Sequence, residues 1–154
     1  MNPYAKYLGD RDPLAVIAAT PSELAALSAG LSSEAASRQP APGSWSVSQV
    51  ICHLADTEIA FAFRIRQALA QPNHVIQPFD QDAWATHYAA YDLPTAIELF
   101  SALRRWNILL LSSLTPADFE RPLSHPERGA MKFRTLLETM AGHDLNHLAQ
   151  ARRG

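Results

Sequence analysis

Residues 46–71 read SVSQVICHLADTEIAFAFRIRQALAQ and form the longest helical pattern in the chain. The pattern begins with a capping box, because Ser46 is followed three residues later by Gln49. It ends before Pro72, since proline cannot continue a helix. We therefore predict a helix from residue 47 to about residue 71.

Outward from this helix, apolar residues recur at helical spacing, and no convincing alternation indicates a strand. The tetrapeptide Thr20-Pro21-Ser22-Glu23 is a second capping box, with proline at the first helical position. A helix should therefore start there and stop at Gly30, after a shorter turn at Asp12-Pro13.

Two further long helices are expected, from about Pro94 to Leu114 and from Phe133 to Arg152. The second follows Lys132, a poor N-cap residue, so its start should be less well supported. Segment 72–92 is an expected crossover with a short helix near residues 80–88, and segment 124–129 is an expected loop. Four long helices with one extended crossover describe an all-α four-helix bundle.

The size and composition narrow the class of protein. A length of 154 residues predicts a single domain, residues 1–154. A formal net charge of −2 supplies no electrostatic footprint for nucleic acid or an anionic membrane. The single cysteine, Cys52, cannot form an internal disulfide, and neither a signal-like stretch nor a membrane-length apolar run is visible. We expect a cytoplasmic protein with no nucleic-acid or membrane partner.

Two of the six histidines, His143 and His147, lie four residues apart in a predicted helix. Residues at this spacing share a face, so their imidazoles could bind one metal ion. The pair is also compatible with ordinary core or surface histidines. Asp144 stands where the HExxH metalloproteases carry a glutamate, so their general base is missing from its usual position.

His53 lies on a largely core-facing part of the second helix, where a buried imidazole needs partners for its polar atoms. It could be a core histidine bonded to a carbonyl or carboxylate, or a third ligand facing the pair. Three neutral imidazoles would leave one coordination position open, as in catalytic zinc sites. The residues alone leave both interpretations open.

Helical geometry nominates possible neighbours of such a site. Thr57 and Arg64 share the face of His53, and Gln150 shares the face of His143 and His147. Arg64 could hold an anionic substrate group, and Gln150 could orient a histidine. The loop residue His125 could reach the open end of the bundle, whereas His74 and His87 are interpreted as surface residues.

Two motifs resemble a known family. Residues 42–58, PGSWSVSQVICHLADTE, are similar to the start of the second helix in the DinB/YfiT-like superfamily. The phrase HPERG at 125–129, followed by GHDLNHLAQ at 142–150, resembles its C-terminal signature. Asp80, Trp84 and Tyr88 also fit its crossover.

The resemblance implies an up-down-down-up bundle, usually homodimeric, with His53, His143 and His147 as ligands of a divalent metal such as zinc, nickel, iron or manganese. Relatives include thiol-dependent transferases that use bacillithiol or mycothiol, and proteins described only as candidate metal-dependent hydrolases.

Our leading hypothesis is a metal-dependent enzyme for a small-molecule substrate, of the thiol transferase or hydrolase type. Its reacting group would be water or a low-molecular-weight thiol activated by the ion. The alternative is a non-catalytic metal-binding stress-response protein whose histidines only stabilise the bundle.

Overall fold

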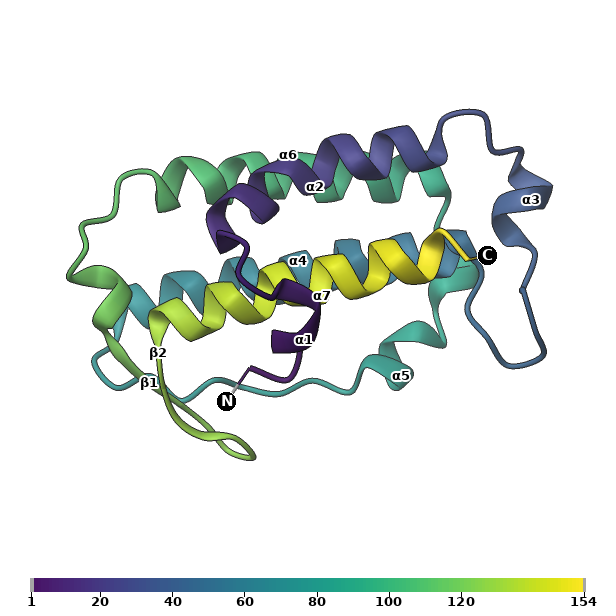
Figure 1. Ribbon diagram of the computed structural model, residues 1–154. Helices are drawn as coiled ribbons and strands as arrows, with labels where there is room; N and C mark the ends of the chain where they lie inside the picture. Colours follow the sequence, from purple (N-terminus) through teal and green to yellow (C-terminus); the bar gives the residue numbers. More distant parts are fainter. Residues whose placement is uncertain (1, 154) are drawn as a thin grey trace.

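The computed structural model describes residues 2–153, whose four long helices form a bundle of two layers (Figure 1). Helices α2 (Pro13–Ser28) and α7 (Phe133–Ala151) run in one direction, and α4 (Val47–Ala70) and α6 (Leu93–Leu111) run in the other. Each long helix packs against two others, since α2 and α4 both contact α6 and α7. The predicted all-α bundle with up-down-down-up topology is confirmed.

Shorter elements connect or flank the long helices. The crossover after α4 runs back along the bundle before α6 begins (Figure 1). The short helices and strands are α1 (Ala5–Leu8), α3 (Ser33–Ser37), α5 (Gln81–Ala85), the 3-10 turns η1 (Tyr88–Ala90) and η2 (Asp118–Glu120), β1 (Pro122–His125) and β2 (Gly129–Lys132).

Helix α4 begins as predicted. The Ser46 hydroxyl accepts a hydrogen bond from the Gln49 amide, and the Gln49 side chain accepts one from the Ser46 amide. Helix α7 follows Lys132, whose side chain makes no capping bond. The amide of Phe133 at this start donates instead to the carbonyl of Arg121, at 2.9 Å.

The predicted start of the first long helix at Pro21 is wrong. Helix α2 begins at Pro13 with Asp12 as its N-cap, and Pro21 lies inside the helix. A proline there leaves the carbonyl four residues earlier, on Ile17, without its usual backbone donor. In the folded protein the guanidinium of Arg104 on α6 donates to that carbonyl, at 2.9 Å. A partner from another helix thus supplies the hydrogen bond that the proline removes.

The expectation of no strand is also wrong, because β1 and β2 form an antiparallel hairpin that pairs Leu123 with Met131. The predicted loop at 124–129 is confirmed only at residues 126–128, which form the turn between the strands. Ser124 additionally exchanges backbone hydrogen bonds with the crossover, donating to the His74 carbonyl and accepting from the Ile76 amide. Each strand has four residues, too few for a clear alternation of apolar and polar side chains. The hairpin therefore depends on its contacts with the crossover and with α7.

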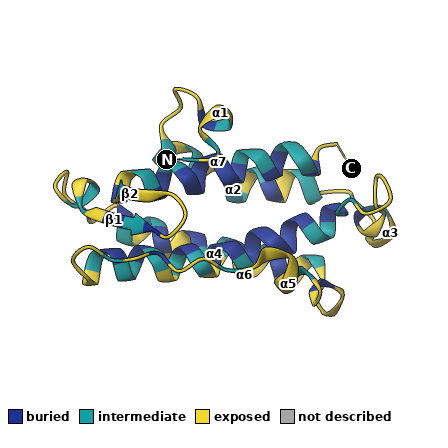
Figure 2. Ribbon diagram, turned by 90° about the horizontal axis from the view of Figure 1, so that it is seen from below, coloured by how far each residue is buried: buried dark blue, intermediate teal, exposed yellow. Residues whose placement is uncertain are grey.

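Buried residues occur along all four long helices (Figure 2). The apolar ones form two clusters, one toward each end of the bundle. One includes Ile17, Phe61 and Met140, and the other includes Leu24, Val50 and Leu148. On α2, α6 and α7, buried polar residues lie in sequence between the two clusters, and on α4 they lie near the boundary, with His53 just before Leu54 and Ala55 of the second cluster. These residues, which we call the polar layer, are Thr20 on α2; His53, Thr57 and Glu58 on α4; Arg104 and Asn107 on α6; and His143, Asp144 and His147 on α7.

None of the helices within residues 2–153 combines the length and the apolar character needed to cross a membrane.

Candidate metal centre

Within the polar layer, the imidazoles of His53, His143 and His147 meet between α4 and α7. We call these three residues the histidine cluster. One ring nitrogen from each lies within 4.8 Å of the others, and the Nε2 atoms of His53 and His143 are 3.1 Å apart. All three side chains are buried. The adjacency of α4 and α7 therefore brings together residues that are 90 positions apart in the sequence.

Burial keeps these imidazoles neutral at ordinary pH. Desolvation, and then the proximity of His147, lowers the pKa of His53 to about 3. Desolvation also lowers the pKa of His143 well below its usual value, and it is the main cause of the lowered pKa of His147. Neutral imidazole is the form that binds metal, because its unprotonated nitrogen offers a lone pair.

The orientation of His147 is set by Gln150, whose Oε1 lies 2.8 Å from the His147 Nδ1. Since an amide oxygen can only accept, Nδ1 carries the proton and Nε2 is free to act as a ligand. The Thr57 hydroxyl lies 3.4 Å from the His53 Nε2. Among residues 2–153, no partner is found for the buried Nδ1 atoms of His53 and His143.

The cluster suits a divalent metal ion. Two imidazole nitrogens bound at about 2.0–2.1 Å around a tetrahedral ion lie roughly 3.3–3.4 Å apart. The 3.1 Å between the Nε2 atoms of His53 and His143 is within a few tenths of an ångström of that spacing. Neutral nitrogen donors fit zinc, nickel and iron, and no carboxylate belongs to the group.

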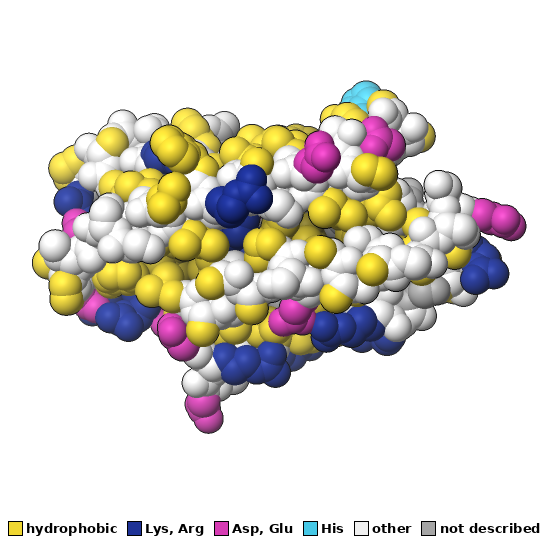
Figure 3. All heavy atoms as spheres, turned by 90° about the horizontal axis from the view of Figure 1, so that it is seen from above, with side chains coloured by type: hydrophobic (Ala, Val, Ile, Leu, Met, Phe, Trp, Pro, Cys, Tyr) yellow, Lys and Arg dark blue, Asp and Glu magenta, His cyan; other side chains and the backbone are white. Residues whose placement is uncertain are grey.

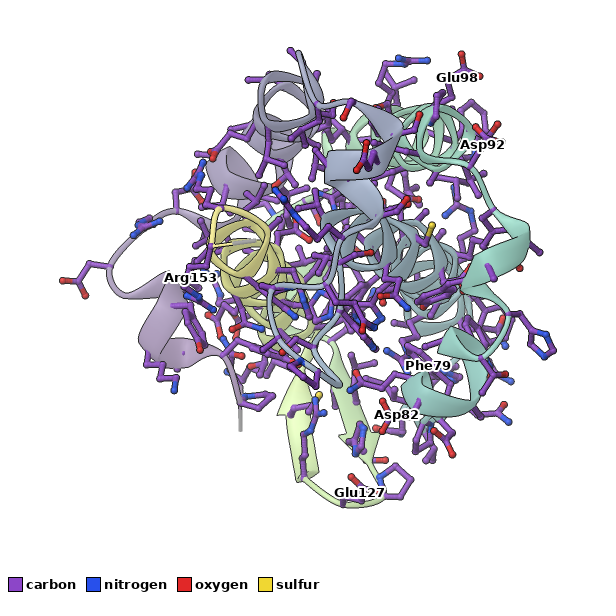
Figure 4. All side chains as sticks on the ribbon, turned by 90° about the vertical axis from the view of Figure 1, so that its right-hand side faces the viewer. Phe79, Asp82, Asp92, Glu98, Glu127 and Arg153 are labelled. Carbon is purple, nitrogen blue, oxygen red and sulfur yellow. The ribbon has the colours of Figure 1, made fainter. Side chains whose placement is uncertain are left out.

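A pocket of about 170 Å³ reaches the histidine cluster from the surface. Two of the imidazoles, those of His53 and His143, form part of its wall. Phe79 comes from the crossover and Glu127 from the turn of the hairpin, and Figure 4 labels both. Other lining residues are Tyr4, Thr57, Phe61, Arg64, His125 and Arg128.

Only some of the residues that the sequence suggested as neighbours of the site line this pocket. Thr57 and Arg64 line the pocket, whereas Gln150 contacts His147 and is not among the lining residues. His125 also lines the pocket, where it is buried and its Nδ1 accepts a hydrogen bond from the Glu127 amide. His74 and His87 are not part of the pocket.

The N-terminal helix α1 packs against α7 and covers one side of the cluster. The ring of Tyr4 meets that of His143 edge-on, with 5.2 Å between the centroids. This close approach depends on Gly142, because a β-carbon at that position would lie 2.7 Å from the Tyr4 carbonyl oxygen and from its β-carbon. Gly142 is therefore the point on α7 where the segment before α1 docks.

A second group in the polar layer was not expected from the sequence. Arg104 is fully buried, and its guanidinium donates to Glu58, Asp144 and the Ile17 carbonyl through all five of its N–H bonds. Asn107 donates to Glu58, and the Thr20 hydroxyl donates to Asp144. We call Thr20, Glu58, Arg104, Asn107 and Asp144 the charge cluster.

Glu58 and Arg104 are charged residues of long helices, and such residues are usually solvated. Here each side chain is only 1% exposed, and the two form an ion pair at 2.8 Å. Burial alone would lower the pKa of Arg104, but the carboxylates of Asp144 and Glu58 outweigh it and raise that pKa. One signal was available, because Arg104 lies four residues after Phe100 and seven before Leu111, on the buried stripe of α6.

The comparisons with known proteins agree with this fold and show the family. The sequence profile of the DinB superfamily matches residues 17–151, and the chain belongs to that superfamily. Helix α1 and Tyr4 lie before the matched range.

Curated relatives come from several bacilli. A protein of Oceanobacillus iheyensis, named as a candidate metal-dependent hydrolase, is 39% identical over 109 residues, which are 70% of this chain and 63% of that protein. A protein of Geobacillus thermodenitrificans with the same description is 35% identical over 142 residues, which are 89% of this chain and 79% of that protein. The aligned part of the chain thus spans less than two thirds of the Oceanobacillus protein.

Among solved structures, YfiT from Bacillus subtilis superposes with a TM-score of 0.84 over 91% of this chain and 82% of its own, at 24% identity. YfiT is described as a probable metal-dependent hydrolase with an unusual four-helix bundle topology. At this identity, the likeness establishes the fold.

Proposed function

We propose that this chain is a divalent-metal-dependent enzyme that acts on a small molecule, with His53, His143 and His147 as the metal ligands. The observation that carries the proposal is the convergence of three neutral imidazoles at the wall of a pocket that opens to solvent. The relatives described as candidate metal-dependent hydrolases support the same class of function.

A divalent ion bound by these imidazoles would supply Lewis acidity toward an oxygen or sulfur atom of the bound molecule. The protein's own residues hold and enclose that molecule. Gln150 keeps the His147 proton on Nδ1, and the rings of Tyr4, Phe61 and Phe79 exclude water from the pocket wall. The Thr57 hydroxyl, beside His53, can donate a hydrogen bond to a group near the cluster.

The first test is metal content in protein purified without a nickel column. We expect close to one zinc, nickel, iron or manganese ion per chain in the wild type, and at least a hundredfold weaker binding in His53→Ala. His87→Ala is the matched control, because His87 is exposed and outside the pocket. Full-occupancy, tight binding in His53→Ala would overturn the assignment.

The type of reaction needs a separate test. Thiol transfer is chemically favourable because a metal ion lowers the pKa of a bound thiol. Hydrolysis needs a general base, and the carboxylate that lines the pocket, Glu127, is exposed on the hairpin turn. Screening electrophiles with and without low-molecular-weight thiols separates the two reactions. A turnover rate that does not depend on the thiol would exclude the thiol transferase.

A non-catalytic metal-binding role is the rival function. It predicts a large loss of thermal stability on chelation and no turnover. The pocket that reaches His53 and His143 favours the enzyme over this rival, because a purely structural site needs no path to solvent. Turnover that is lost in His53→Ala would decide between them.

We also propose that the protein works as a homodimer. Ile59 and Phe63 of α4 and Leu99 and Trp106 of α6 are large apolar residues that are 40–62% exposed. Ile59 and Leu99 line the same surface groove, and Figure 3 shows apolar side chains at the surface on the side of α2 and α6. A surface of this kind is typical of protein–protein contacts.

Sedimentation equilibrium tests the dimer. We expect Phe63→Glu to shift the protein toward the monomer, whereas Val75→Glu, at an exposed apolar residue of the crossover, should not. A monomeric wild type would contradict the proposal. The cytoplasmic location stays a prediction.

A further inference from the structure

Two arginines of the pocket wall, Arg64 and Arg128, form no ion pair with any of residues 2–153. Arg64 projects from α4, and Arg128 lies in the turn of the β1–β2 hairpin. Among residues 2–153, no carboxylate lies within ion-pair distance, 4.0 Å, of either guanidinium. Glu127 also lines the pocket, but it pairs with neither arginine.

Arg64 is partly buried and held in place without charge compensation. Its Nη2 donates to the Gln77 carbonyl at 2.7 Å, and its guanidinium lies 5.8 Å from the centroid of the Phe61 ring and 5.3 Å from that of Phe79. Contacts of this kind fix the orientation of the guanidinium. Gln77 is its only hydrogen-bond partner among the described residues, so other N–H groups stay available.

The two arginines line the same pocket, so their charges affect each other. Desolvation and then the charge of Arg128 lower the pKa of Arg64 to about 10. Desolvation and then the charge of Arg128 lower the pKa of His125; the charge of Glu127 opposes this, and that of Arg64 adds to the lowering. Two like charges at one partly desolvated pocket are unfavourable unless an anion lies between them.

His125 adds a neutral donor to the same pocket. Its Nδ1 accepts from the Glu127 amide, at 3.2 Å, so the proton of the neutral ring is on Nε2. The pocket therefore offers N–H donors from two guanidiniums and one imidazole near its mouth, and the histidine cluster at its inner wall. An oxyanion is the ligand that matches these donors.

We propose that Arg64 and Arg128 form an oxyanion-binding subsite, which takes the carboxylate or phosphate group of a small substrate whose other end reaches His53 and His143. The role of that other end rests on the proposed function. The subsite assigns the substrate to the class of small organic acids or phosphate esters, whereas the histidine cluster alone would accept a neutral molecule equally well.

Three probes of similar shape test the subsite: benzoate, phenylphosphonate and benzamide. Their dissociation constants are measured by calorimetry or ligand-observed NMR, on zinc-loaded protein and on protein stripped with a chelator. We expect the wild type to bind at least one of the two anions about tenfold more tightly than benzamide in both forms, the size expected for charge-assisted hydrogen bonds. Comparison of benzoate with phenylphosphonate shows whether carboxylate or phosphate is preferred.

Substitution of the arginines tests whether they cause the preference for the anions over benzamide. Arg64→Gln and Arg128→Gln should each reduce it at least threefold, and Arg64→Lys should retain part of it because the charge stays. Arg38→Gln is the matched control, since Arg38 is exposed, lies outside the pocket, and forms no ion pair with another of residues 2–153. Arg128 is on an exposed turn, so Arg128→Gln keeps the test valid if Arg64→Gln fails to fold.

The proposal is overturned if benzamide binds as tightly as the anions, or if Arg38→Gln reduces the preference as much as the pocket variants do. It is also overturned if the preference exists only in zinc-loaded protein and survives Arg64→Gln, because the metal would then carry it. Failure of the proposed function is a different result: the anion preference persists, but the protein retains no metal.

Discussion

The charge cluster and the histidine cluster lie side by side in the polar layer, yet their polar atoms are satisfied to very different degrees. Every N–H of Arg104 has an acceptor, and the carboxylates of Glu58 and Asp144 both pair with it. In the histidine cluster, the buried Nδ1 atoms of His53 and His143 have no partner among the described residues. His143 and Asp144 are consecutive residues of α7, so the two clusters share a helix backbone.

This difference between the two clusters indicates that the charge cluster has a structural role and that the histidine cluster has another. A cluster that satisfies its own charges holds helices together, and α2, α4, α6 and α7 all contribute to the charge cluster. In the histidine cluster, one ring nitrogen from each of three neutral imidazoles converges within 4.8 Å without a carboxylate in the group, so a site for a ligand explains it better. The following predictions test this distinction, from the largest expected effect to the smallest.

Breaking the charge cluster should be the most destructive change. Arg104→Met leaves the buried carboxylates of Glu58 and Asp144 and the Ile17 carbonyl without their donor, so we expect a loss of about 3–5 kcal/mol of unfolding free energy. Urea denaturation measures it. Arg105→Met is the control. Arg105 is the exposed neighbour of Arg104, so this substitution should change the free energy of unfolding by less than about 0.5 kcal/mol. Equal effects at both positions would mean that the charge cluster has no special role.

Weakening the hydrogen bond that orients His147 should change metal binding instead. Gln150→Ala removes the acceptor for the His147 Nδ1 proton, and loss of such a partner costs roughly 10–100-fold in metal affinity. Zinc titration against a competing chelator measures it. Asn146→Ala, on the same helix and without a side-chain hydrogen bond, should leave the affinity unchanged. An unchanged affinity in Gln150→Ala would exclude the orienting role.

A change beside both clusters tests the docking of the N-terminal segment. Alanine is a better helix former than glycine, so Gly142→Ala would stabilise a free helix by about 0.5–1 kcal/mol. Because the new β-carbon would lie 2.7 Å from Tyr4 atoms, we expect net destabilisation by about 1–2 kcal/mol. Hydrogen exchange should then show weaker protection of α1. A more stable variant with unchanged α1 protection would contradict the tight docking.

The smallest effect on stability is expected from a substitution in the histidine cluster of metal-free protein. In chelator-treated protein, His143→Met should change stability by less than about 1 kcal/mol, because methionine fills a similar volume and removes an unpaired buried nitrogen. Zinc should raise the melting temperature of the wild type and not that of the variant. A loss comparable with that of Arg104→Met, in the absence of metal, would show that the histidines are part of the structural core.

Much of the fold follows from local signals. The capping box at Ser46 sets the start of α4, and the apolar spacing of α6 and α7 gave boundaries within a few residues of those observed. The site was predictable in part for the same reason, since the four-residue spacing of His143 and His147 puts both on one helix face. The family motifs supplied the third histidine.

The sequence by itself determined the long helices and the histidine pair, because capping and helical periodicity depend on residues only a few positions apart. Only the tertiary structure decided that α2 continues through Pro21, that Arg104 is buried, and that His53 faces His143. Each of these depends on a partner from a distant segment: Arg104 bonds the Ile17 carbonyl, Glu58 and Asp144 pair with Arg104, and α7 packs beside α4. The periodicity of α6 places Arg104 on the buried stripe of that helix. The partners that bury it lie on distant segments and leave no periodic signal in the sequence, so they become visible only when the helices are packed together.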